Sequence, residues 1–188
     1  MTFTPLAIPE VILIEPTLHG DARGYFFESY RQDQFAAHGI AAAFVQDNMS
    51  SSTRNVVRGL HYQLDPHAQG KLVRVVRGTV FDVAVDLRRG SPTFGRAVAS
   101  VLSAENKRAM YVPPGFAHGF CVVSDLAEFQ YKCTGYYAAA HERSILWNDP
   151  ALEIAWAIDA GVARLSAKDA AAPVLARAEI NYVYPVRS

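Results

Sequence analysis

The residues best suited to chemistry lie in one short stretch, residues 58–71, which reads Arg-Gly-Leu-His-Tyr-Gln-Leu-Asp-Pro-His-Ala-Gln-Gly-Lys. His61 lies inside it, and Arg58 and Lys71 carry fixed positive charges on either side. An imidazole titrates near neutral pH, so a histidine in this setting is a candidate general base. The two cations are candidates to stabilise an oxyanion or hold a phosphate, although a lone cation is more often a solvated surface charge. The stretch therefore favours general acid–base chemistry.

A histidine base needs a carboxylate that fixes its tautomer, and a reaction that moves protons also needs an acid. Asp82, Asp86 and Asp169 are each candidates for the carboxylate. Tyr131 is the candidate acid, because a phenol with its ordinary pKa of about 10 still carries its proton at neutral pH. The alternative for Tyr131 is a core aromatic whose hydroxyl is satisfied by hydrogen bonds. The sequence thus predicts a base and an acid and leaves the carboxylate open.

Arg58 and His61 differ in parity along the chain. In a regular strand they would face opposite sides of the sheet. Both reach one pocket only if Gly59 marks a bulge or if the strand begins after Arg58. The sequence leaves these two alternatives open.

Other catalytic chemistries find little support. The His-Tyr-Gln sequence at 61–63 lacks the second histidine of the His-x-His pair that metal-binding β-barrels often use, and His67 and His118 do not complete a ligand set. There is no Gly-x-Ser-x-Gly elbow and no phosphate-binding glycine loop. Cys121 and Cys133 lie in apolar runs, which is typical of reduced, buried thiols. We therefore predict catalysis without a metal or cofactor.

The composition is that of one globular domain, which we place at residues 1–188. The 18 basic and 18 acidic side chains cancel, so the totals give no sign of a nucleic-acid or membrane-binding surface. The N-terminal residues lack the basic start and apolar core of a signal peptide, and no apolar run approaches the roughly 20 residues of a membrane helix. We expect a cytoplasmic protein that binds neither nucleic acid nor membrane.

The elements that must position these residues are mostly short strands. About ten of them, separated by turn signals, predict an all-β, mainly antiparallel sandwich or barrel with short peripheral helices. Strands 71–76 and 79–87 are expected to form a hairpin at Arg77-Gly78. The second strand should alternate, with Phe81, Val83, Val85 and Leu87 on one face and Val80, Asp82, Ala84 and Asp86 on the other. Residues 18–24 and 47–52 are expected to be polar loops, and Arg23, Glu28, Gln46 and Asn48 in or near them are candidates to bind a polar ligand. Helix is expected at 33–38 and in part of 167–177.

A series of stretches along almost the whole chain matches, in order, the motifs of one known family. They read Asp-Ala-Arg-Gly-Tyr-Phe-Phe-Glu at 21–28, Phe-Val-Gln-Asp-Asn-Met-Ser at 44–50, Arg-Gly-Leu-His-Tyr-Gln at 58–63, Gln-Gly-Lys-Leu-Val-Arg-Val at 69–75, Asp-Val-Ala-Val-Asp-Leu-Arg at 82–88, Ser-Pro-Thr-Phe-Gly at 91–95, Pro-Pro-Gly-Phe-Ala-His-Gly-Phe at 113–120, Tyr-Lys-Cys-Thr-Gly-Tyr-Tyr at 131–137, Ile-Leu-Trp-Asn-Asp-Pro at 145–150 and Leu-Ser-Ala-Lys-Asp at 165–169. In these stretches the chain resembles the dTDP-4-dehydrorhamnose 3,5-epimerase family.

The resemblance implies a cupin-type jelly-roll β-barrel that forms a homodimer and needs no metal. It implies epimerisation at C3 and C5 of dTDP-4-dehydro-6-deoxy-D-glucose, a step of dTDP-L-rhamnose synthesis. By motif, His61 is the base, Asp169 its carboxylate partner and Tyr131 the acid on the opposite face of the sugar. Lys71 and Arg58 lie near the sugar oxygen and the phosphates. Positions that match nucleotide-sugar binding residues are Arg23, Glu28, Gln46, Asp47, Asn48, His118, Glu142 and Lys168, and Tyr137 matches the aromatic residue that stacks on thymine.

Three rival functions stay open at this point. The nearest is an epimerase that inverts only C3 or only C5 of a dTDP-4-keto-deoxysugar, since the same acid and base serve both. A metal-dependent cupin oxygenase is disfavoured by the missing His-x-His pair. A non-catalytic sugar-nucleotide binder leaves the joint presence of His61, Tyr131 and Lys71 unexplained.

Overall fold

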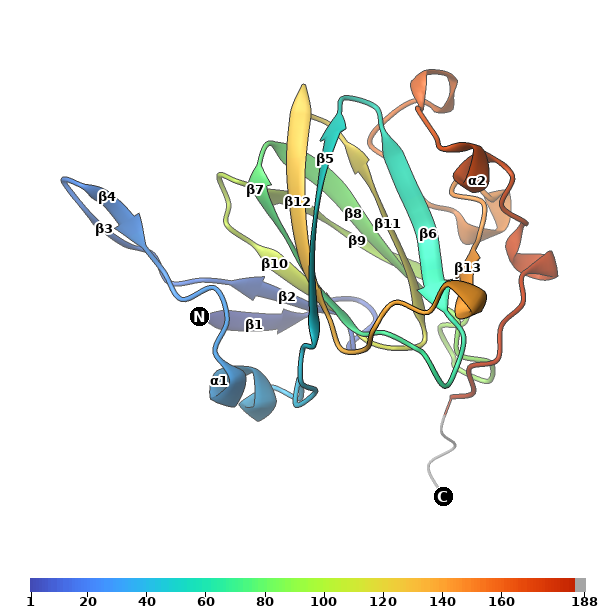
Figure 1. The fold of residues 1–188 in the computed structure, drawn as a ribbon, viewed down its shortest axis with the longest axis horizontal. Coiled ribbons are helices and arrows are strands. Elements are labelled where there is room, and N and C mark those ends of the chain that lie inside the picture. The colour runs from blue at the N-terminus through green and yellow to red at the C-terminus, as the bar shows by residue number, and fades with distance from the viewer. Residues whose placement is uncertain (185–188) are drawn as a thin grey trace.

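Two antiparallel sheets packed face to face make up most of the molecule, in a computed structural model that describes residues 1–184 (Figure 1). In spatial order the larger sheet comprises β1 (Thr2–Pro5), β2 (Ile12–Glu15), β10 (Ala109–Val112), β7 (Lys71–Arg77), β12 (Leu126–Cys133) and β5 (Gln46–Thr53). The smaller sheet comprises β13 (Glu142–Ser144), β6 (Val57–Gln63), β11 (Phe116–Val122), β8 (Thr79–Asp86) and β9 (Ala97–Ser103). The prediction of a mainly antiparallel all-β fold is confirmed.

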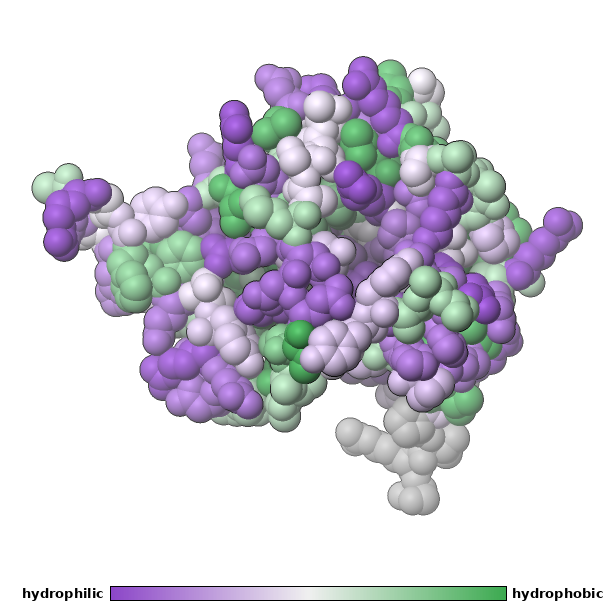
Figure 2. Space-filling model, viewed as in Figure 1, coloured by the Kyte–Doolittle hydropathy of each residue, from purple (hydrophilic) through white to green (hydrophobic). Residues whose placement is uncertain are grey.

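A third, two-stranded sheet stands apart from these two. Strands β3 (His19–Asp21) and β4 (Gly24–Phe26) form a hairpin in which every residue is exposed. It projects away from the barrel, as both the ribbon and the space-filling view show (Figures 1 and 2). The prediction that residues 18–24 form a loop is therefore wrong, because their backbone pairs with residues 24–26.

Helical segments are short and lie outside the sheets, as predicted. They are α1 (Gln32–Ala37), η1 (Ala139–His141), η2 (Pro150–Leu152), η3 (Ala160–Val162), α2 (Ala167–Ala170) and η4 (Leu175–Arg177). Helix α1 ends before Gly39, whose positive φ of 85° suits a glycine. Among residues 1–184, none of the helices has the length and apolar character needed to cross a membrane.

Apolar side chains from the facing sides of the two sheets form the main core. They include Val73, Val75, Met110 and Phe129 from the larger sheet and Val80, Ala84, Phe116, Phe120 and Val122 from the smaller one. Helix α1 covers part of the outer face of the larger sheet through Phe35. The C-terminal segment covers the outer face of the smaller sheet through Ile180 and Tyr182. Each sheet is thus buried on both sides over much of its area.

Strand β8 shows the alternation that the sequence predicted. Val80 and Ala84 face the main core, whereas Val83 and Val85 belong to the cluster on the outer side. The predicted hairpin between β7 and β8 is wrong, however. The two strands belong to different sheets, so the chain crosses from one sheet to the other at Gly78. A side chain at Gly78 would collide with the carbonyl of Leu126, which explains why a glycine occupies this crossing.

Strand β5 occupies the segment that was expected to be a polar loop. Its sequence, Gln-Asp-Asn-Met-Ser-Ser-Ser-Thr, contains neither glycine nor proline and pairs with β12 along its whole length. Even-numbered residues face the space between the sheets and odd-numbered residues face solvent. Hydrogen bonds to the neighbouring strand, rather than β propensity, account for this strand.

Candidate active site

A bulge in β6 brings Arg58 and His61 to the same face of the smaller sheet. His61 pairs with His118 on β11 and Arg58 pairs with Phe120, so the two residues between them oppose the single residue Gly119. The register shift cancels the difference in parity between Arg58 and His61, and the predicted bulge alternative at Gly59 is confirmed. Gly59 has a φ of 125°, and a Cβ on it would lie 2.6 Å from the Cα of Gly119. Only glycine fits this position.

His61 is joined to Asp169, a residue 108 positions further along the chain. Its Nε2 lies 2.6 Å from Oδ1 of Asp169, whose side chain is 4% exposed. Asp169 is held at the start of α2, where its backbone N–H donates to the hydroxyl of Ser166. Of the three carboxylates that the sequence left open, the structure therefore places Asp169 beside the candidate base.

The charge of Asp169 fixes the tautomer of His61. Burial alone would raise the pKa of this carboxyl, but hydrogen bonds with His61 and Ser166 and the nearby Lys168 hold it below its ordinary value. An ionised carboxylate can only accept, so Nε2 of His61 carries the hydrogen. In the neutral imidazole the lone pair then lies on Nδ1, which is the nitrogen free to take a proton.

Tyr131 and Lys71 belong to the opposite wall. On β12 and β7 the residue pairs Tyr131–Val73 and Cys133–Lys71 lie side by side, so all four side chains point between the sheets. Burial and the neighbouring Cys133 raise the pKa of Tyr131. Burial lowers the pKa of Lys71, against the pull of Cys133 and of acidic neighbours. The phenol is thus kept protonated, and the Lys71 ammonium lies 6.0 Å from the centroid of its ring.

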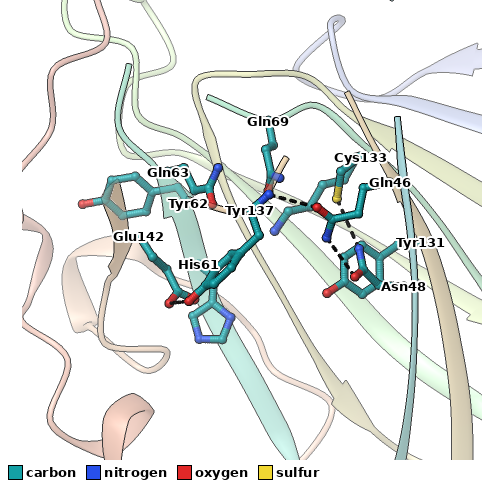
Figure 3. A pocket seen from close by; sticks show the side chains of 11 residues that line it. Gln46, Asn48, His61, Tyr62, Gln63, Gln69, Tyr131, Cys133, Tyr137 and Glu142 are labelled. Atoms are coloured by element: carbon teal, nitrogen blue, oxygen red, sulfur yellow. Dashed lines mark hydrogen bonds between the residues drawn. The ribbon is translucent and has the colours of Figure 1, made fainter. Parts of the chain in front are cut away.

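These walls enclose one open cavity of about 450 Å³, counting its mouth (Figure 3). His61 lies on one side, on β6, and Tyr131 on the other, on β12. The residues that line it are Gln46, Asn48, His61, Tyr62, Gln63, Gln69, Lys71, Tyr131, Cys133, Tyr137 and Glu142. Of these, Tyr62, Gln63, Gln69 and Cys133 were not predicted as site residues. The position of Cys133, two residues after Tyr131 on the same strand face, was the available signal.

A hydrogen-bonded chain forms the rim of the cavity. The Tyr137 hydroxyl donates to Glu142 Oε2 at 2.8 Å, and the same oxygen forms an ion pair with Lys168. The backbone N–H of Tyr137 donates to Gln46, whose side chain donates in turn to Asn48. The structure therefore brings these five predicted binding residues together.

His118 lies beside His61, on the neighbouring strand β11, and is buried. Its Nε2 is 3.0 and 3.1 Å from the two carboxylate oxygens of Asp82, and both residues are buried. Burial raises the pKa of Asp82 despite the opposing effects of His118 and Lys71. Asp86 instead accepts hydrogen bonds from Arg88, Ser91 and Thr93 at the edge of the sheet. The sequence alternatives Asp82 and Asp86 thus have other partners.

Six predicted binding residues are not in the lining of this cavity. Arg58, His118 and Lys168 lie next to residues that line it, whereas Asp47, Arg23 and Glu28 lie away from it. Asp47 points to the outer face of β5 and pairs with Lys132 at 2.9 Å. Arg23 lies in the turn of the projecting hairpin, where its side chain is 91% exposed and paired with Asp21. Glu28 follows that hairpin, 3.8 Å from Arg31. Within one copy of the chain these last three residues do not meet His61.

A metal site does not emerge from the geometry. Within the described residues 1–184, no group of three or more histidine, cysteine, aspartate or glutamate side chains is placed to hold an ion. The expectation that no metal or cofactor takes part stays a prediction.

Comparison with known proteins gives consistent matches over nearly the whole chain. The family model described as dTDP-4-dehydrorhamnose 3,5-epimerase matches residues 5–177. A dTDP-4-dehydrorhamnose 3,5-epimerase of Pseudomonas aeruginosa is 63% identical over 157 residues, 83% of this chain and 86% of the relative. The crystal structure of a dTDP-6-deoxy-D-glucose-3,5-epimerase from Legionella pneumophila in complex with dTDP-4-keto-L-rhamnose has a TM-score of 0.94 and 48% identity, and covers 98% of this chain and 99% of its own.

A relative with narrower activity is also similar. The structure of a 3'-monoepimerase from Streptomyces bikiniensis in complex with dTDP-quinovose has a TM-score of 0.85 and 38% identity, and covers 92% of this chain and 87% of its own. The barrel is therefore shared by enzymes that invert one centre and by enzymes that invert two.

Proposed function

The chain belongs to the dTDP-4-dehydrorhamnose 3,5-epimerase family, and we propose that His61, Asp169, Tyr131 and Lys71 carry out its reaction. The enzyme is an isomerase with a cupin-type barrel. It inverts C3 and C5 of dTDP-4-dehydro-6-deoxy-D-glucose and forms dTDP-4-dehydro-L-rhamnose. The observation that carries the assignment of residues is the His61–Asp169 pair on one wall of a cavity whose other wall bears Tyr131.

The 4-keto group explains how one base can serve two carbons. A ketone at C4 acidifies the hydrogens on both C3 and C5, because the carbanion formed at either carbon is delocalised onto the ketone oxygen. Nδ1 of His61 takes the proton, and Asp169 stabilises the resulting imidazolium. A positioned base of this kind contributes about 10²–10⁴ in rate. A small shift of the sugar, or a flip of its ring, then presents the second carbon.

Inversion requires that the new proton come from the other face. Tyr131 projects from the opposite sheet, and its raised pKa keeps the proton in place until the carbanion accepts it. Lys71 supplies the positive charge near the ketone oxygen. Among the hydrogen bonds and ion pairs of residues 1–184 none involves its ammonium group, so this group is available to the enolate. A single well-aimed donor to an oxyanion contributes about 3 kcal/mol.

The chain acts, in our proposal, as a single domain over residues 1–188 that forms a homodimer. The exposed hairpin supports the dimer, because it carries Arg23 beside the exposed side chains of Tyr25 and Phe26, which are 60% and 66% exposed. Arg23 and Glu28 can contribute to a site if the hairpin enters the cavity of a second copy. We also propose a cytoplasmic location, since a nucleotide diphosphate sugar is highly charged and water-soluble. A monomer in sedimentation velocity would contradict the dimer.

Deuterium exchange tests the function and the assignment of the acid together. In D2O, the wild-type enzyme should place deuterium at both C3 and C5 of dTDP-4-dehydro-6-deoxy-D-glucose, and a downstream reductase should trap the doubly inverted product. The variant Tyr131→Phe should still exchange protons but complete inversion about 10²-fold more slowly, since it keeps the base and loses the acid. Label at one carbon only would identify a single-centre epimerase. Normal inversion by Tyr131→Phe would mean that another group is the acid.

A further inference from the structure

A second hollow adjoins the catalytic cavity and shares His61 with it. It has about 650 Å³ of empty space, counting its open side, and lies between the first residues of β6 and the segment that leads into α2. Its lining residues are Val56, Val57, Arg58, His61, Arg164, Leu165, Ser166, Lys168 and Asp169. Three are cationic, and the one carboxylate, Asp169, is engaged by His61. The hollow therefore suits an anion attached to whatever occupies the cavity next to it.

Arg164 is fixed against β6 by backbone hydrogen bonds. Its N–H donates to the carbonyl of Asn55, and its carbonyl accepts from Val57, which places it beside Val56 in a parallel bridge. Residues paired in such a bridge point to the same side of the sheet. Leu165, the next residue, packs with Val57 on the outer side. Arg164 therefore faces the same side as Val56 and Arg58.

Arg58 and Arg164 also both lack a counter-charge. Among the ion pairs formed by residues 1–184, neither guanidinium takes part, and Arg58 donates only to the neutral Ser52 hydroxyl at 3.0 Å. Lys168, by contrast, is already paired with Glu142. Neighbouring strands lie about 4.8 Å apart, so two arginines on adjacent segments and the same face can hold one group with several acceptor oxygens.

We propose that Arg164 is a further substrate-binding residue, which together with Arg58 holds the diphosphate of the nucleotide sugar in this hollow. The inference rests on the proposed function, because it takes the sugar to lie against His61 in the adjoining cavity. Since His61 borders both spaces, the bond between sugar and phosphate would pass beside it. The two arginines then anchor the part of the substrate that does not react, and binding at a distance aligns the sugar with the base.

Arg164→Gln tests this assignment, and Arg177→Gln is the matched control, since Arg177 is an exposed arginine in η4 outside both spaces. The loss of one charge-assisted contact should raise KM and weaken dTDP binding in calorimetry by about 10-fold or more, with little change in kcat. Binding of thymidine, which lacks the diphosphate, should be the same in both variants and the wild type. Arg164→Lys should recover part of the dTDP affinity.

Two results would overturn the inference. One is wild-type affinity for dTDP in Arg164→Gln. The other is an equal loss of thymidine and dTDP binding, which would indicate a structural role. Because dTDP binding is measured without turnover, a wild-type enzyme that bound dTDP but failed to epimerise would contradict the proposed function and not the role of Arg164.

Discussion

The two ends of the barrel interior are made by the same strands but have opposite character. On β7, Val73 and Val75 point into the main core, whereas Lys71, on the same side of the strand, lines the catalytic cavity. On β12, Phe129 lies in the core, and Cys133 lines the cavity. Alternation therefore decides which side chains enter the barrel, and position along the strand decides whether they pack in the core or line the cavity.

We call the end that contains the core the closed end and the end that contains the cavity the open end. Burial of apolar side chains at the closed end stabilises the fold. Phe129 is 1% exposed and stacks on Phe120 with ring centroids 4.2 Å apart. The open end instead contains the polar side chains that line the cavity, and polar groups held ready for a ligand add little to the stability of the fold. Substitutions at the two ends should therefore separate loss of activity from loss of stability.

His61→Ala should have the largest effect and should act on activity. Removal of the base should lower kcat by about 10²–10⁴-fold. The free energy of unfolding should fall by only about 1–2 kcal/mol, because Asp169 loses one hydrogen bond and water can enter the space left by His61, which lines the open cavity. Steady-state kinetics and urea unfolding measure the two quantities. His38→Ala, outside the larger sheet, is the control and should keep near-wild-type kcat. Activity of His61→Ala within a few-fold of wild type would contradict the assignment.

Phe129→Ala should show the opposite pattern at the closed end. Truncation of a fully buried aromatic side chain costs about 3–5 kcal/mol, which urea or thermal unfolding would detect. The kcat of the remaining folded enzyme should fall far less than in His61→Ala, since no reacting group is removed. Phe94→Ala is the matched control, since Phe94 is 37% exposed and a surface change typically alters stability by only about 0.5 kcal/mol. Equal losses of stability in Phe129→Ala and Phe94→Ala would contradict the stabilising role assigned to the closed end.

The smallest effect concerns the stability of the protein at low pH, to which Asp169 at the open end contributes. The folded pKa of Asp169 lies below its ordinary value of 3.8, so its pairing stabilises the protein above that pH and is lost as the pH falls through the folded pKa. At pH 7, Asp169→Asn should be less stable than wild type by about 1–3 kcal/mol, as for a buried hydrogen bond to a charged group. Urea unfolding from pH 7 to pH 3 should show this gap closing below about pH 4. A gap independent of pH would mean that the carboxylate is not ionised.

The fold was predictable where side chains alternate and not where pairing crosses between sheets. The alternation of β8 identified its two faces correctly from the sequence. The turn at Gly78 carried the same local signal as a hairpin, but the partners of β7 are β10 and β12, which lie far away in sequence. Local turn chemistry cannot reveal which strand will pair with which.

For the candidate site, the sequence predicted the types of residue involved better than it predicted which side chains contact one another. The stretch around His61 predicted a candidate base, yet only the fold places Asp169, rather than Asp82 or Asp86, beside it. The side chain of Asp47 points outward because of strand geometry, although its neighbours in sequence, Gln46 and Asn48, line the cavity. The structure adds Arg164, whose relevance depends on a bridge between segments more than a hundred residues apart.

Strand β5 has a consequence for the behaviour of the protein in a crowded cell. It is the last strand of the larger sheet, so the backbone groups on its free side could recruit a strand from another molecule and start an aggregate. Its outward side chains include Asp47 and Ser51, and Lys132 reaches Asp47 from the neighbouring strand. Charged and hydroxylated side chains keep such an edge hydrated and discourage pairing between molecules. The polar composition that hid this strand in the sequence thus also favours solubility.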